Sequence, residues 1–195
     1  MKLILASTSP TRRKILASAG ILAEAISPGV DEDPRGIEDP VALAGALALR
    51  KALAIDPRRG TWVLGSDQVA YDPEHRSDNW GKPKNPLDHL DRLRACRGRV
   101  HDLATGWALV GPDGAALMGV ERARMHVRGD LTDDELQAYV GTGEGAHCAG
   151  GYAVEGLGGF LFERIDGDWY TVLGLPLFPI VGALRQVGWR FGSQP

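Results

Sequence analysis

Cysteine is scarce in this chain, and long apolar runs are absent from it. The 195 residues include two cysteines, Cys96 and Cys148, too few for a disulfide framework or a cysteine-rich metal cluster. No run approaches the roughly 18 apolar residues that a membrane-spanning helix needs, and the apolar stretch after Lys2 is too short for a signal peptide. We therefore expect reduced thiols, a cytoplasmic location and no membrane partner.

A surplus of basic residues is also missing. The formal net charge is −3, whereas surfaces that bind DNA or RNA are strongly basic. The sequence has no GxxxxGK[ST] phosphate-binding loop and no Ser-His-Asp or Cys-His signature of a nucleophilic hydrolase. These absences argue against a nucleic-acid polymer as partner, against a P-loop nucleotidase and against covalent catalysis. A small charged ligand is the better expectation.

The elements that are present indicate an α/β fold. Apolar residues make up 44% of the chain, enough for a sizeable core. Capping residues and prolines predict helices at 10–19, 40–55, 86–96, 132–140 and 176–187. Apolar runs predict strands at 2–6, 23–27, 61–66, 99–110, 115–127 and 160–165. Their alternation, with a turn at 111–114, predicts an α/β core with a mixed sheet. The length fits one domain over 1–195 or two lobes around a central cleft.

The segment that opens the chain has the pattern of an anion cradle. A short apolar strand runs into Ser7 and Ser9, and a proline then opens a helix that carries Arg12 and Arg13. Backbone N–H groups at a helix start, hydroxyl groups and guanidinium groups all favour a phosphate. The alternative is an ordinary helix cap at Ser9 followed by two solvated arginines.

Four charged residues further along supply the other parts of a phosphate-processing site. They are Glu32 in an acidic triplet, Lys51 near the end of a helix, Asp67 after an apolar strand, and Lys82 between glycine and proline. Carboxylates can hold a divalent cation or accept a proton from water, and lysines can neutralise phosphate. Taken singly, these residues also fit solvated turns or a helix end. Together they suit metal-assisted hydrolysis of a phosphoanhydride.

In chain order, the motifs resemble the Maf family of nucleoside triphosphate pyrophosphatases. The matching segments are LASTSPTRRKIL at 5–16, VDE at 30–32, RKA at 50–52, GSDQV at 65–69, GKP at 81–83, AGGYAVEG at 149–156 and VLGLPL at 172–177. The resemblance implies an α/β fold with an elongated mixed β-sheet flanked by helices, similar to that of inosine triphosphate pyrophosphatases. It also implies cleavage between the α and β phosphates of a nucleotide, with Mg²⁺ or Mn²⁺ as cofactor, and a homodimer.

The same resemblance implies roles for single residues at the phosphate end of the site. It places Ser7 and Arg12 on the triphosphate, with Arg13 as a further phosphate contact. It makes Lys51 and Lys82 additional catalytic partners of the phosphates.

Two acids complete the catalytic set that the resemblance implies. Glu32 and Asp67 would hold the metal, and Asp67 would accept the proton from the attacking water. A competing hypothesis is a nucleotide-binding regulator of cell division or septum formation, in which hydrolysis is incidental.

Substrate choice in the family is tied to three positions, which here are Thr11, Gln68 and Glu155. Gln68 and Glu155, with the runs at 147–150 and 162–164, are similar to the 7-methyl-GTP pyrophosphatase subgroup. The alternative is the branch that acts on dTTP and UTP. A carboxylate can accept hydrogen bonds from the guanine N1–H and N2 amino group, and 7-methylation adds a positive charge that it favours.

Thr11 departs from the pattern of that subgroup, which has tryptophan at this position. Threonine lacks the aromatic face on which a cationic base could stack. Another tryptophan could supply that face or could belong to the core; the candidates are Trp62, Trp80, Trp107 and Trp169. The glycine-rich segment 141–151 is likewise either a ligand-facing loop or a plain connection.

Overall fold

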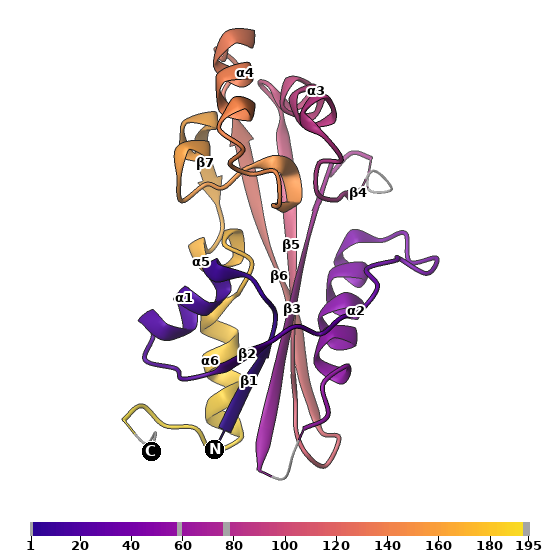
Figure 1. The fold of residues 1–195 in the computed structure, drawn as a ribbon, viewed down its shortest axis with the longest axis vertical. Coiled ribbons are helices and arrows are strands. Elements are labelled where there is room, and N and C mark those ends of the chain that lie inside the picture. Colours follow the sequence, from indigo (N-terminus) through magenta and orange to yellow (C-terminus); the bar gives the residue numbers. More distant parts are fainter. Residues whose placement is uncertain (1, 58–59, 76–78, 193–195) are drawn as a thin grey trace.

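The computed structural model describes residues 2–57, 60–75 and 79–192, which form one mixed sheet with its helices (Figure 1). The sheet has seven strands in the order β2-β1-β3-β5-β6-β7, with β4 paired to β3. The strands are Lys2–Ala6 (β1), Glu24–Ile26 (β2), Thr61–Tyr71 (β3), Asn79–Trp80 (β4), Val100–Val110 (β5), Ala116–Val127 (β6) and Phe162–Asp166 (β7). β1 is parallel to β2 and β3, and the other pairs are antiparallel. The predicted α/β class with a mixed sheet is confirmed.

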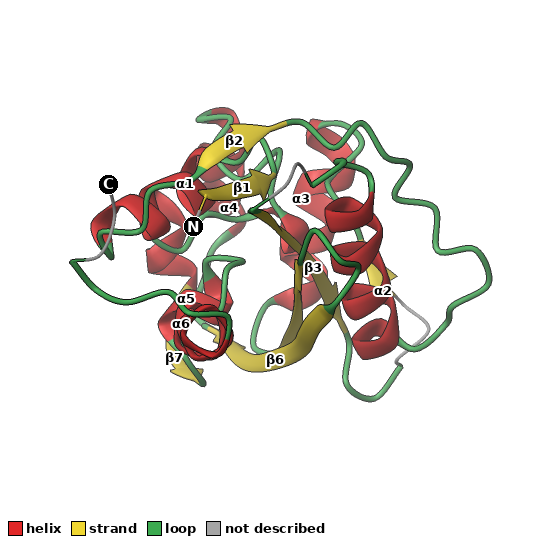
Figure 2. Cartoon of the chain, turned by 90° about the horizontal axis from the view of Figure 1, so that it is seen from below, coloured by secondary structure: helices red, strands yellow, loops and turns green. Residues whose placement is uncertain are grey.

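Helices cover both faces of the long strands. The α-helices are Pro10–Ser18 (α1), Pro40–Leu53 (α2), Pro86–Cys96 (α3), Asp133–Gly141 (α4), Trp169–Val172 (α5) and Leu177–Gln186 (α6), and the 3-10 helices are Ala149–Gly151 (η1) and Leu157–Leu161 (η2). Helix α2 lies on one side of β3 and β5 (Figure 1). Helices α1, α5 and α6 lie on the other side, and α3 and α4 lie at one end of the molecule. The view along the long axis shows β3 between α2 and α6 (Figure 2). Across the described residues, every helix falls short of the length or the apolar character that a membrane crossing requires.

Four of the predicted helix starts agree with the structure because each depends on a local cap. The fifth helix, α6, begins at Leu177 without a side-chain cap. The side chains of Ser9, Asp39 and Asn85 each accept a hydrogen bond from the backbone N–H three residues further on, and a proline follows each of them. Thr132 and Glu135 form the predicted capping box. Ser9 is therefore an ordinary cap of α1, and the same turn also faces the cavity described below.

Two strands differ from the prediction. The strand predicted at 61–66 continues to Tyr71, because β5 pairs with it along its length. Asp67 therefore lies inside a strand and not after its end. The segment predicted as a strand at 160–165 begins as the 3-10 helix η2 before it becomes β7. The short elements β4 and α5 carry too little periodicity to be predicted from sequence.

The core lies on both faces of β3. Leu64 packs in a cluster with Ile180 of α6, whereas its neighbour Val63 packs with Ala48 of α2. Successive strand residues point to opposite faces, so a strand covered on both faces is a continuous apolar run. A separate cluster that includes Leu136 of α4 forms the core at the α3 and α4 end.

Helix α2 approaches the sheet closely because two strand residues beneath it are glycines. A Cβ atom on Gly106 of β5 would lie 2.2 Å from the carbonyl oxygen of Ala44, and one on Gly65 of β3 would lie 2.2 Å from that of Ala48. A larger residue at either position would clash with the helix backbone. The close approach brings Lys51, one turn further along α2, to the middle of β3.

Candidate active site

A cavity of about 550 Å³ opens where the β1–α1 turn, α2 and β3 meet. Its volume lies within the roughly 300–1,000 Å³ that is typical of small-molecule sites. Its walls are residues 6–12, 27–30, 147–149 and 172–174, together with Glu32, Lys51, Asp67, Gln68, Gly81, Lys82, Tyr152, Val154 and Glu155. All of the predicted site residues except Arg13 line this one cavity.

Lys51 joins the two predicted acidic residues. Its ammonium Nζ lies 2.6 Å from Oε1 of Glu32 and also contacts Oδ1 of Asp67. Lys51 and Asp67 are buried, each 7% exposed, whereas the Glu32 carboxylate is half-exposed at the mouth. Lys82 is exposed, and its Nζ lies 3.8 Å from Oε2 of Glu32. Two carboxylates and two lysines, remote in sequence, therefore form one charged group.

The neighbouring lysines hold Glu32 in its ionised form. Burial raises the pKa of Glu32, but the hydrogen bond and charge of Lys51 lower it, as do the charges of Lys82 and Arg12. The net result is a pKa below the ordinary value of 4.5. Glu32 is therefore a carboxylate at neutral pH.

The carboxylates of Glu32 and Asp67 fit a hard divalent cation. Lys51 contacts one oxygen of each group, so a second oxygen of each is not held by that lysine. Mg²⁺ is commonly bound by one or two carboxylates together with substrate phosphates. Both acids line the same cavity as Ser7 and Arg12, and this all-oxygen pair suits Mg²⁺ or Mn²⁺.

Arg12 is fixed by the protein before any ligand binds. Its Nε donates to the carbonyl of Gly174 at 2.8 Å, and its Nη1 donates to the carbonyl of Ser66 at 2.8 Å. Burial lowers the pKa of Arg12, and the charges of Asp67 and Glu32 oppose this shift. A cation in this position stays charged and faces the acidic end of the cavity.

Ser7 lies beside Arg12 at the end of the cavity where phosphate binding was predicted. Its Oγ accepts hydrogen bonds from the backbone N–H of Ser9 at 3.2 Å and from Nη1 of Arg12 at 3.4 Å. Because both contacts use the oxygen as acceptor, the Ser7 hydroxyl proton can be donated to a ligand. Arg13, the next residue on α1, is exposed and lies outside the cavity lining. The structure therefore does not place Arg13 with the other residues that were predicted to bind phosphate.

The side-chain amide of Gln68 has a fixed orientation. Its Nε2 donates to the carbonyls of Thr171 and Val172 at 2.9 and 3.0 Å and to Oγ1 of Thr105 at 3.0 Å. Carbonyl oxygens only accept, so the nitrogen of Gln68 must point toward them. The oxygen Oε1 is consequently the atom that Gln68 can offer to a ligand.

Glu155 and Thr11 meet at the rim of the cavity. The Thr11 hydroxyl donates to Oε1 of Glu155 at 3.1 Å, across 144 positions of sequence. Glu155 is exposed at the rim of the cavity. The three positions that the family resemblance ties to substrate choice, Thr11, Gln68 and Glu155, therefore share this cavity, and two of them present acceptor oxygens.

None of the four candidate tryptophans lines the cavity. Trp107 is buried in the core, Trp62 and Trp80 pack partly buried against core clusters, and Trp169 of α5 is 45% exposed. The suggestion that one of them replaces the missing aromatic face at Thr11 is wrong, because each packs or points elsewhere. Tyr152 is in the cavity lining, and its ring packs against Phe162 in the core.

Sequence reasoning missed two parts of the wall. Residues 27–29, which follow β2, carry no charge or motif that marks them as ligand-facing. Tyr152 lies inside a recognised motif, yet only the structure shows that this residue also lines the cavity. The glycine-rich segment 141–151 contributes 147–149 to the wall, so the ligand-facing interpretation of that loop holds for this part.

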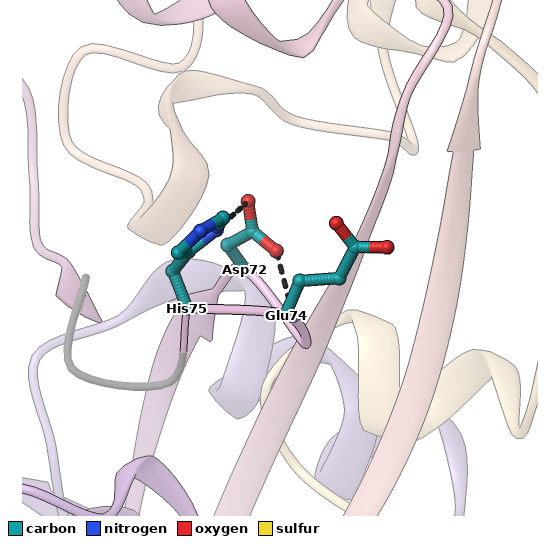
Figure 3. Close-up of side chains that lie close together, drawn as sticks. All are labelled: Asp72, Glu74 and His75. Atoms are coloured by element: carbon teal, nitrogen blue, oxygen red, sulfur yellow. Dashed lines mark hydrogen bonds and ion pairs between the residues drawn. The ribbon is translucent and has the colours of Figure 1, made fainter.

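A second group of titratable side chains lies apart from the cavity. Potential ligand atoms of Asp72, Glu74 and His75 fall within 4.8 Å of one another after β3 (Figure 3). Asp72 accepts hydrogen bonds from the backbone N–H of Glu74 at 2.8 Å and contacts Nδ1 of His75 at 3.4 Å. These contacts stabilise a local turn, and we assign no function to the cluster.

Comparison with known proteins gives matches over nearly the whole chain. A family described as Maf-like protein matches residues 2–187. A dTTP/UTP pyrophosphatase of Thermus thermophilus is 40% identical over 96% of both chains. A nucleoside triphosphate pyrophosphatase of Rhodopseudomonas palustris is 40% identical over 94% of this chain and 93% of its own. A 7-methyl-GTP pyrophosphatase of Rhizobium meliloti is 38% identical over 95% of this chain and 96% of its own.

Proposed function

This chain belongs to the Maf family, and from that premise we propose that it is a nucleoside triphosphate pyrophosphatase. The proposed reaction cleaves the α–β phosphoanhydride and releases a nucleoside monophosphate and pyrophosphate, with Mg²⁺ or Mn²⁺ as cofactor. The observation that carries the proposal is the contact of Lys51 with both Glu32 and Asp67, in the cavity that also contains Ser7 and Arg12. The pyrophosphatase names of the relatives support it.

The cavity residues have complementary roles in this reaction. Arg12, Ser7 and Lys82 bind phosphate oxygens and offset the negative charge that builds up as the anhydride breaks. Lys51 contacts Asp67 and holds its carboxyl group in one orientation. Asp67 accepts a proton from the attacking water while the new P–O bond forms and the bond to the leaving pyrophosphate breaks. A bound Mg²⁺ or Mn²⁺ would add charge neutralisation and make that water more acidic.

We propose 7-methyl-GTP as the substrate. The polarity of the base-side wall, by which we mean Thr11, Gln68 and Glu155, supports this choice. Oε1 of Gln68 and the carboxylate of Glu155 are acceptors. The guanine edge has two adjacent donors, N1–H and the N2 amino group, whereas thymine and uracil have a single N–H donor. A carboxylate also favours the positive charge of a 7-methylated base. The competing substrates are dTTP and UTP, because the relative from Thermus thermophilus is named a dTTP/UTP pyrophosphatase.

The test is a screen of canonical and methylated nucleoside triphosphates for released pyrophosphate. We expect turnover with Mg²⁺ or Mn²⁺, loss of turnover on chelation, and the highest kcat/KM with 7-methyl-GTP. Asp67→Asn removes the proton acceptor and is expected to lower kcat by about a hundredfold or more. Asp72→Asn is the matched control, because Asp72 follows the same strand outside the cavity.

Each other outcome of the screen has a definite meaning. A preference for dTTP and UTP would overturn the proposal that 7-methyl-GTP is the substrate, but it would still support the proposed reaction. Unchanged activity in Asp67→Asn would overturn the catalytic role of that residue. Tight nucleotide binding without turnover of any triphosphate would overturn the enzyme and favour the regulator.

A further inference from the structure

The loop at 145–151, which leads to Glu155 in the base-side wall, packs against its own backbone at glycine residues. Gly145, Gly150 and Gly151 have φ values of 80°, 80° and 82°, in the left-handed region that side chains disfavour. A Cβ atom on Gly145 would lie 2.4 Å from the carbonyl oxygen of Gly151. The carbonyl of Gly151 is therefore enclosed by its own loop, and it needs a hydrogen-bond donor there.

That donor is His89, in the first turn of α3. His89 is 2% exposed, and its Nε2 lies 2.5 Å from the carbonyl oxygen of Gly151. A carbonyl oxygen cannot donate, so Nε2 carries the proton of this bond. His89 lies outside the cavity lining and outside every motif that predicted the site.

The His89 ring and the segment that carries Lys82 both pack close to Gly151. A Cβ atom on Gly151 would lie 2.9 Å from Cδ2 of His89 and 3.3 Å from Cγ of Pro83. Gly151 is thus held between the His89 ring and the ring that follows Lys82. A movement of this loop would displace Lys82 at the phosphate end as well as the base-side wall.

The next residue, Tyr152, is fixed by a second buried histidine. The Tyr152 hydroxyl lies 2.6 Å from Nε2 of His101 of β5. Burial lowers the pKa of His101 to about 4, so this imidazole is neutral at physiological pH. Two adjacent residues, Gly151 and Tyr152, are each held by a buried imidazole, and Glu155 follows three positions later.

We propose that His89 is a positioning residue that sets the base-side wall of the cavity. This inference rests on the proposed function, because it concerns how the same cavity selects a nucleotide. Loss of the Nε2–H bond frees the Gly151 carbonyl, and Tyr152 and Glu155 then lose their fixed places in the cavity wall. The consequence is weaker binding, with a reduced preference between bases.

The experiment compares His89→Leu with His89→Gln. Leucine removes the donor, whereas glutamine retains an amide N–H at a similar reach. We measure the dissociation constants of 7-methyl-GTP and UTP by calorimetry, KM and kcat for both, and the melting temperature. His89→Leu is expected to weaken binding of the preferred nucleotide about tenfold, the value of one net hydrogen bond. The effect on KM should exceed that on kcat, and the ratio between the two nucleotides should shrink.

His89→Gln is expected to restore both the affinity and the ratio to within about threefold of the original protein. His75→Leu is the matched control, since His75 is exposed and remote from the cavity. A lower melting temperature in His89→Leu with unchanged dissociation constants and ratio would overturn the inference and leave a purely structural role. If the original protein binds nucleotides without hydrolysing any, the proposed function fails, whereas the shifts in binding still support the role of His89.

Discussion

Lys51 makes it possible for two carboxylates to share one cavity. Asp67 is buried, and an isolated buried carboxylate would cost several kcal/mol of desolvation. Lys51 contacts it from α2 and reaches Glu32 with the same ammonium group. A buried ion pair of this kind is weak evidence for stability, so its placement beside Ser7 and Arg12 is better explained by chemistry.

Glu32 gives a test of this electrostatic arrangement. Its pKa in the folded state lies below its ordinary value of 4.5, so its ionised form stabilises the fold above that pH and the contribution is lost as pH falls through the folded-state pKa. The difference in unfolding free energy between the original protein and Glu32→Gln should therefore be larger at pH 6 than near pH 3. Urea unfolding at each pH measures it. A difference that does not change with pH would contradict the role of Lys51 and Lys82 at this carboxylate.

Glu155 is the residue on which base selection should depend most. Glu155→Ala removes the carboxylate that Thr11 orients, and we expect kcat/KM to fall about tenfold more for 7-methyl-GTP than for UTP or dTTP, as for the loss of a charged hydrogen-bond partner. Steady-state kinetics on the three substrates measures this. Glu121→Ala, at an exposed position of β6, is the control. Equal losses on all substrates would remove Glu155 as the base-reading residue.

At the scale of elements, local signals were predicted well and pairing was not. The caps at Ser9 and Thr132 act on neighbouring backbone groups, so the sequence around them contains all the information needed. The end of β3 depends on its pairing partner, because Asp67 lies opposite Gly106 and Gln68 opposite Thr105 in β5. In the sequence alone, polar residues inside a strand cannot be distinguished from residues that follow its end, because the pairing partner is unknown.

The contact between α2 and the sheet is the element-scale feature most sensitive to substitution. Gly106→Ala would place a methyl group 2.2 Å from the carbonyl oxygen of Ala44, and we expect a loss of about 2 kcal/mol or more of unfolding free energy from overpacking. Activity should fall with it, because Lys51 is on the helix that must move. Chemical unfolding and pyrophosphate release measure the two effects.

Gly182→Ala in α6 is the matched control for this substitution. A Cβ atom there meets no atom within 4 Å, so alanine should be neutral or add up to about 1 kcal/mol through helix propensity. A neutral Gly106→Ala would show that α2 has room that the structure does not indicate.

At the scale of the whole molecule, the cavity is made by segments that are distant in sequence. The motifs predicted that Ser7, Arg12, Lys51 and Asp67 belong together, and the structure places them in one cavity. The fixed amide of Gln68 was not predictable, since its partners follow more than 30 positions later in the chain. Arg13 could not be separated from Arg12 by sequence, because only the orientation of α1 makes one face inward. The homodimer and the single domain stay predictions.

A ligand that binds this cavity should stabilise the folded protein, because the cavity exists only when its several segments are folded together. A non-hydrolysable triphosphate analogue at a hundred times its dissociation constant adds about 2.7 kcal/mol of stability. For a domain of this size that corresponds to a rise of about 5–10 °C in melting temperature. Thermal unfolding with and without the analogue measures it. Lys51→Met should reduce the rise, and an unchanged rise would contradict a role for Lys51 in ligand binding.

The anchoring of Arg12 to Gly174 and Ser66 has a thermodynamic consequence for association. Immobilising a long side chain at the moment of binding costs roughly 0.5–1.5 kcal/mol. Here that ordering takes place when the chain folds, so an incoming polyanion meets a preorganised guanidinium. The entropy term at encounter is then smaller, and the gain in affinity comes from the tertiary structure and not from any added contact with the ligand.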